Sequence, residues 1–151
     1  MQIAETSPIV ACRLIGGARA IPSIVDELIG FDALAEPSGK STPETLEILG
    51  LAMNEVLHSI NEFAGEQTTA DDASVELWTG DTLIVFCAKF HGNPLPDWLT
   101  KNWDRAQEPA VLAPSTDAGW GWLLVREALD SVSHIWRGSQ QVLFLEKRMR
   151  R

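Results

Sequence analysis

Residue types that could carry catalysis or bind a metal are few in this chain and widely spaced. The three histidines, His58, His91 and His134, lack the close spacing of metal-binding motifs such as His-Glu-x-x-His. No serine or cysteine lies in a nucleophile-elbow context, which disfavours hydrolase chemistry. Gly119-Trp120-Gly121 opens a helical stretch, where backbone N–H groups can cradle phosphates, although such glycine pairs also serve helix packing alone.

The two cysteines, Cys12 and Cys87, each lie in an apolar stretch and share no Cys-x-x-Cys spacing. This pattern predicts two buried free thiols. Residues 1–8 lack the charged start and apolar core of a signal peptide, so nothing indicates an oxidising compartment. No apolar run approaches the ~20 residues that cross a bilayer. We therefore expect a cytoplasmic protein that does not bind membranes.

Length and charge narrow the classes of function. The 151 residues include 12 Lys and Arg against 21 Asp and Glu, which gives a net charge of −9. A chain of this size is expected to form one domain, residues 1–151, that buries roughly 70% of its unfolded surface. The negative charge disfavours a broad phosphate-neutralising surface, so direct binding to nucleic acid is not expected. We interpret the basic residues 147–151 as a solvated tail.

Apolar periodicity predicts helices over residues 18–29 and about 43–64. Pro22 falls in the first turn of the first helix, where its missing N–H costs little. The second helix follows a capping sequence, Ser41-Thr42-Pro43-Glu44, and should end at Gly65. At 1.5 Å per residue it would be roughly 33 Å long, and we expect it to be the central helix.

Strands are predicted over residues 9–15, 74–79, 82–90, 131–137 and 140–147, with hairpin turns at Gly80-Asp81 and Gly138-Ser139. A short helix is expected within 96–103 and another from Gly119 to about residue 129, while 108–118 looks irregular. Because hairpins make most of such a sheet antiparallel, we predict an α+β fold. The expected architecture is a two-layer α/β sandwich, with a mostly antiparallel mixed sheet and helices on one face.

Four segments of the chain, taken in sequence order, resemble segments of the proteins of one known family. Helix residues 51–63, with Glu55 inside, resemble a Glu-x-x-x-Asn helix, and residues 83–96 resemble an Asp-x-Gly-x-Pro segment. Residues 119–126 resemble a Gly-x-Gly-Leu helix start, and residues 130–148 resemble a closing hairpin. The family is the GHKL (Bergerat-fold) ATPases, and the most similar branch is the anti-sigma-factor serine kinases of bacterial partner-switching systems.

The resemblance implies a site for ATP and Mg²⁺ between the long helix, the glycine loops and the sheet. It places Glu55 as the general base and Gly119 and Gly121 at the phosphates. Ser59 stands at the position of the family's metal-binding asparagine, and a hydroxyl is a shorter and weaker Mg²⁺ ligand than an amide oxygen.

The adenine-binding part of that site departs furthest from the family. Phe90 stands where the family has the aspartate that binds the adenine amino group, two residues before Gly92. The resemblance implies that Gly92 contacts the nucleotide, and without a working site it would be a turn glycine. Loss of that carboxylate removes a charge-assisted hydrogen bond worth about 1.5–3 kcal/mol. We therefore expect nucleotide binding to be weak or lost, and Glu55 is equally well interpreted as a solvent-facing helix residue.

The sequence thus predicts a bacterial regulatory protein of the anti-sigma-factor type, which binds and sequesters a sigma factor or a STAS-type antagonist. The alternative is an active ATP-dependent serine protein kinase that phosphorylates its antagonist. A phosphotransfer-like adaptor using His58 is a third option, and homodimerisation is left open. Four tryptophans are expected around the loops of the site, either as an exposed anchor for a partner or as extra core: Trp98, Trp103, Trp120 and Trp122.

Overall fold

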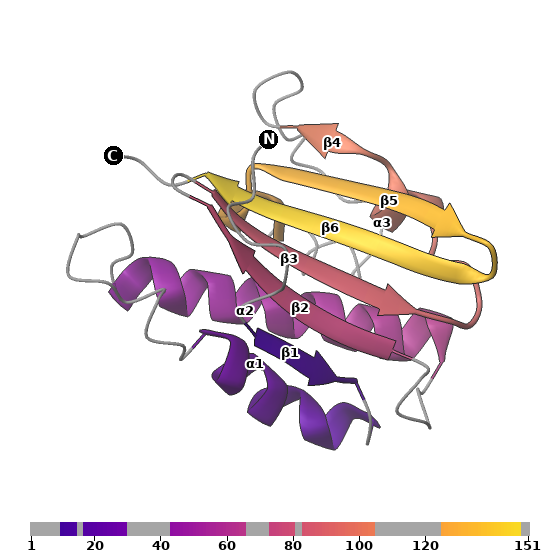
Figure 1. Cartoon of the computed structure of the whole chain (residues 1–151), viewed down its shortest axis with the longest axis horizontal. Helices are drawn as coiled ribbons and strands as arrows, with labels where there is room; N and C mark the ends of the chain where they lie inside the picture. Colours follow the sequence, from indigo (N-terminus) through magenta and orange to yellow (C-terminus); the bar gives the residue numbers. More distant parts are fainter. Residues whose placement is uncertain are drawn as a thin grey trace.

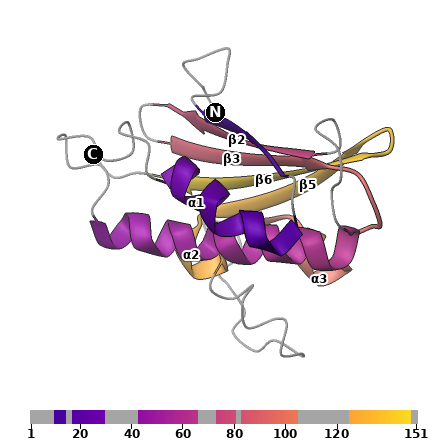
Figure 2. The ribbon, with the colours of Figure 1, turned by 90° about the horizontal axis from the view of Figure 1, so that it is seen from below.

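A six-stranded sheet organises the part of the chain that the computed structural model describes, residues 10–14, 17–29, 43–65, 73–80, 83–104 and 125–148. The strand order is β1-β2-β3-β6-β5-β4, and all pairings between the described strands are antiparallel. The helices lie against one face of this sheet (Figures 1 and 2). The predicted α+β class is confirmed, and the arrangement is compatible with a two-layer sandwich. The strands are β1 (Val10–Arg13), β2 (Ala73–Thr79), β3 (Leu83–Phe90), β4 (Trp103–Asp104), β5 (Ser131–Arg137) and β6 (Gln140–Arg148).

Two helices form most of the second layer. A short 3-10 helix η1 (Gly17–Ala20) leads into α1 (Ile21–Ile29), and α2 (Pro43–Ser59) continues into a π-helical turn η3 (Ile60–Ala64). The long helix ends where the sequence predicts, because Gly65 adopts a φ of 105°, a backbone conformation that favours glycine. In Figure 2 this helix runs along most of the length of the sheet, with α1 packed beside its middle part.

The core lies between the sheet and these helices. On β6 the side chains alternate as expected, since Leu143 and Leu145 join the core with the helices while Phe144 and Glu146 face the other side. The run in β3 is buried on both faces, as its continuous apolar sequence predicts. The largest fully buried side chains come from both layers: Phe86, Phe90, Ile21, Leu28, Leu49, Met53, Leu57, Ile60, Leu77, Leu99, Leu129 and Leu143.

The segment after β3 differs from the expectation of one short helix over residues 96–103. The helix α3 (Asp97–Thr100) has only four residues, and Lys101 then adopts an extended conformation. Trp103 and Asp104 form β4, which pairs with Val132 and Ser131 at the edge of the sheet. Residues 108–118 and the expected helix start at Gly119 lie outside the described residues, whereas residues 125–128 are helical.

Both cysteines are free and buried, as predicted. Burial, together with a smaller contribution from the neighbouring carboxylate of Glu27, raises the pKa of the Cys12 thiol to about 11. Burial also raises the pKa of Cys87 to about 11, although the positive charge of Lys89 partly opposes this. At neutral pH both thiols are protonated and therefore poor nucleophiles.

Candidate functional site

The end of the long helix meets the loop that follows β3, so two of the segments that resemble the family lie against each other (Figure 1). The backbone N–H of Asn93 donates a hydrogen bond of 3.0 Å to the carbonyl of Ala64. Gly92 adopts a φ of 121°, and a Cβ added to it would lie 2.2 Å from the same carbonyl oxygen. The loop therefore needs glycine at this position to approach the helix end.

A buried glutamine on β6 fixes the other side of this loop. Gln141 is 0% exposed, and its Nε2 donates to the carbonyl of Asn93 over 2.9 Å. Its Oε1 accepts hydrogen bonds from Leu95 N at 3.3 Å and lies 3.1 Å from Nε2 of His134. Because a carbonyl can only accept and an N–H can only donate, these partners fix the orientation of the amide and require His134 to donate through Nε2.

Substitution of Gln141 by leucine is expected to lower the free energy of unfolding by about 1–3 kcal/mol. The leucine fills similar space but leaves Asn93 O and Leu95 N without their partner. Urea unfolding followed by tryptophan fluorescence measures the change, with Gln140→Leu, the neighbouring and less buried glutamine, as the matched control. Equal effects of the two substitutions would contradict this role of Gln141.

The residues predicted for a nucleotide site are only partly brought together. Glu55 and Ser59 are half-buried and lie four residues apart on α2, hence on the same side of the helix. Gly92 packs against the end of that helix, at Ala64. Gly119 and Gly121 lie outside the described residues, and so do the phosphate contacts expected of them.

The side chain of Phe90 is buried and does not reach solvent. It is 0% exposed and belongs to the core cluster between the sheet and the helices. It ends the alternating series Ile84, Phe86, Ala88 and Phe90, which all face the helices from β3. The position that the resemblance assigns to an adenine-binding carboxylate is therefore occupied by an aromatic ring packed into the core.

A cation site is not evident in the described residues, among which no group of three or more His, Cys, Asp or Glu side chains could bind a metal ion. Ser59 as a Mg²⁺ ligand stays a prediction. The end of α2 offers the half-buried polar side chains of His58 and Ser59, and the following η3 offers that of Asn61.

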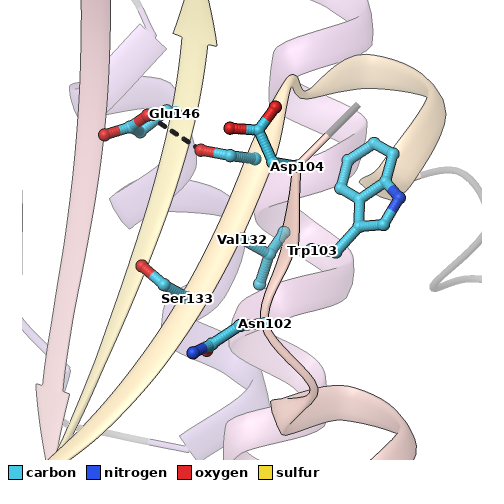
Figure 3. A pocket seen from close by; sticks show the side chains of 7 residues that line it. Asn102, Trp103, Asp104, Val132, Ser133 and Glu146 are labelled. Atoms are coloured by element: carbon cyan, nitrogen blue, oxygen red, sulfur yellow. Dashed lines mark hydrogen bonds between the residues drawn. The ribbon is translucent and has the colours of Figure 1, made fainter. Parts of the chain in front are cut away.

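A hollow of about 610 Å³ lies at the β4 edge of the sheet (Figure 3). Its acids already have partners, since Ser131 donates to Glu146 over 2.8 Å and Arg148 forms an ion pair of 2.9 Å with Asp104. In Figure 3 the indole of Trp103 lies on the opposite side of β4 from the carboxylate of Asp104. The sequence did not single out this hollow, because its lining combines residues 102–104 with the β5–β6 hairpin, which comes much later in the chain: Asn102, Trp103, Asp104, Ser131, Val132, Ser133 and Glu146.

A second hollow, which we call the α1–α2 groove, runs between the two main helices and also has a volume of about 610 Å³. Leu51 lies on its wall with 50% of the residue exposed. Neither hollow is lined by Glu55, Ser59, Phe90 or Gly92. The groove is lined by Pro22, Val25, Asp26, Ile29, Glu47, Gly50, Leu51 and Asn54.

The tryptophans expected around the loops of the site, either as an exposed anchor or as extra core, are described at one position only, and the burial of Trp103 there agrees with extra core. Of the four named for that role, only Trp103 has a described side chain, and it is buried beneath the guanidinium of Arg126, 5.8 Å from the ring centroid. Among the tryptophans whose side chains the structure describes, Trp136 is exposed, at 48%, near the tip of the β5–β6 hairpin. Its ring meets His134 edge-on at 5.7 Å.

Comparisons with known proteins give no identification, since no protein-family model and no curated protein matches this chain. None of the helices among the described residues is both long and apolar enough to cross a membrane.

Proposed function

We propose that this chain is a regulatory protein of the anti-sigma-factor type that binds and sequesters a protein partner in the bacterial cytoplasm. The partner would be a sigma factor or a STAS-type antagonist, and binding would not depend on ATP. The order of elements supports this proposal: strand, helix, long helix, hairpin and closing hairpin follow one another as in the segments that carry the resemblance.

The observation that carries the proposal is the burial of Phe90. An adenine-binding site needs a hydrogen-bond acceptor at this position, and the phenyl ring has none. Reopening the space would require the ring to leave the core at a cost of several kcal/mol. The scaffold therefore favours a function that uses its surface over one that uses a nucleotide.

Exposed apolar side chains on the helical layer provide a second line of support. Ile48 and Leu51 are 44% and 50% exposed on α2, the helix that contains Glu55. Large apolar residues of this kind, close together on one helix, are typical of protein-contact surfaces.

The test combines nucleotide titration with reconstitution. The purified chain is titrated with Mg-ATP by calorimetry, then mixed with each purified sigma factor and STAS-type protein of the same organism and analysed by size-exclusion chromatography. We expect a stable complex with one of them without nucleotide. We also expect that complex to lower transcription by the matching RNA polymerase holoenzyme, and no heat at about 1 mM ATP.

Two results would overturn the proposal. One is the absence of a complex with any sigma factor or STAS-type protein at about 10 μM. The other is ATP binding below about 100 μM together with phosphate transfer to a STAS-type protein that is lost in Glu55→Ala. The second result would establish the active serine kinase instead.

A further inference from the structure

The α1–α2 groove has an apolar floor that one missing side chain keeps open. Gly50 of α2 faces α1, and a Cβ added there would lie 3.8 Å from Val25 Cγ1 and 3.9 Å from Ile29 Cγ1, which is ordinary contact. A methyl group at position 50 would thus just touch α1, and glycine leaves that space between the two helices unfilled. Leu51, next to this position, leaves half of its surface in solvent.

Acidic side chains border the groove on both sides. Asp26 of α1 and Glu47 of α2 are exposed and belong to its lining. The sequences of α1, α2 and η3 contain no lysine or arginine, whereas their acids include Asp26, Glu27, Glu47, Glu55 and Glu62. Arg19 of the preceding η1 is an exposed base, so these helical elements together carry a net negative charge, and the apolar residues among them gather at the α1–α2 groove.

The strands differ in charge, because their sequences contain five basic residues, Arg13, Lys89, Arg137, Lys147 and Arg148, against three acidic ones, Glu76, Asp104 and Glu146. Lys89 pairs with Glu76 at 3.1 Å, and Arg148 pairs with Asp104 at 2.9 Å. The negative charge that the described surface leaves uncompensated lies mainly on the helical layer. A ligand attracted to the groove should therefore be positively charged as well as apolar.

We propose that the α1–α2 groove docks a basic amphipathic helix of the partner protein, with apolar residues at i, i+3/i+4 and i+7 on one side and lysines or arginines beside them. This inference rests on the proposed function and specifies the chemistry of its partner. The apolar side of such a helix covers Leu51 and the groove floor, while its basic residues face Asp26 and Glu47. A second copy of the chain fits poorly, because the same acids would face one another across a symmetric contact.

The probe is a labelled helical peptide of about 18 lysine and leucine residues, roughly five turns, with its leucines on one side. A peptide of the same composition in scrambled order is the comparison. We expect the amphipathic peptide to bind the full chain with a Kd of tens of micromolar at about 0.15 M salt, and the scrambled peptide to bind at least about tenfold more weakly.

Substitutions in the chain then test whether the peptide binds in the α1–α2 groove. Asp26→Lys combined with Glu47→Lys should weaken peptide binding at least about tenfold, and Leu51→Ser about fivefold. All three positions are exposed, so the variants should fold. The matched controls are Glu62→Lys, an exposed acid of the same layer outside the groove, and Ile135→Ser, an exposed apolar residue on β5. Both controls should stay within about twofold of the unmodified chain.

The possible results distinguish a failure of the groove as the docking site from a failure of the proposed function. No peptide binding at about 1 mM, equal binding of the scrambled peptide, or an equal effect of Glu62→Lys would overturn the groove as the docking site. So would a sigma factor or STAS-type complex that the groove variants leave unchanged, although the proposed function would then stand. Peptide binding that maps to the groove, with neither class of partner bound, would support the groove and overturn the proposed function.

Discussion

Replacement of Phe90 by alanine is expected to lower the free energy of unfolding by about 3–5 kcal/mol. The ring is fully buried on the helix-facing side of β3, between Ala73 on β2 and Gln141 on β6 in the sheet register. Its removal costs the transfer free energy of the aromatic group and leaves a cavity that the surrounding sheet cannot close. Urea unfolding followed by tryptophan fluorescence and circular dichroism measures the change.

The matched control for this substitution is Ile135→Ala, which removes an apolar side chain that is 40% exposed on the same sheet. That change should cost less than about 1 kcal/mol, because the side chain is already largely in solvent. A loss below 1 kcal/mol for Phe90→Ala would mean that the ring is not part of the core. In that case the ring would not exclude adenine from this position.

The sequence predicted the regular elements well because their signals are local and repeated. Apolar spacing over many turns located α2, and Gly65 marked its end, since each added turn repeats the same pattern. Strand alternation likewise located β5 and β6 around the turn at Gly138. The antiparallel sheet with helices on one face followed from these hairpins.

Short elements and distant contacts could not be predicted in the same way. The strand β4 has two residues, Trp103 and Asp104, which are too few to show a period. Its pairing of Asp104 with Ser131 joins positions 27 residues apart, about which local pattern says nothing. The hydrogen bonds of Gln141 to the loop after β3 are 48 and 46 residues apart in sequence. The α1–α2 groove depends on how two helices pack, which a single sequence does not specify.

The candidate site illustrates the same limit. Gly92 was named as a possible nucleotide contact or a turn glycine, but its close approach to Ala64 joins positions 28 residues apart and appears only in the folded chain. Phe90, by contrast, could have been assigned to the core from sequence, because it continues the alternation of Ile84, Phe86 and Ala88. The resemblance to the family placed Phe90 in a nucleotide site, whereas the strand alternation placed it in the core. In the folded chain Phe90 lies in the core.

Substitution of Gly92 by alanine is the other change expected to have a large effect, with a loss of at least about 3 kcal/mol in the free energy of unfolding. The added methyl group would meet the carbonyl oxygen of Ala64 at 2.2 Å and its carbonyl carbon at 3.0 Å. Because both atoms belong to the backbone of the helix end, relief requires the loop to move. That movement would break the hydrogen bond from Asn93 N to Ala64 O and strain the contact with Gln141.

Gly138→Ala separates the two sources of this cost. Gly138 also has a positive φ, 60°, but nothing lies within 4 Å of an added Cβ. Alanine at this position should therefore lower the free energy of unfolding only by the cost of the left-handed conformation, about 1–2 kcal/mol. The difference between the two variants, measured by urea unfolding, therefore reports the steric contact between the loop and the end of the long helix. Equal losses at Gly92 and Gly138 would show that the loop does not press on Ala64. In that case the glycine at position 92 would serve the turn alone, and the packing of the β3 loop against the helix would not constrain the site.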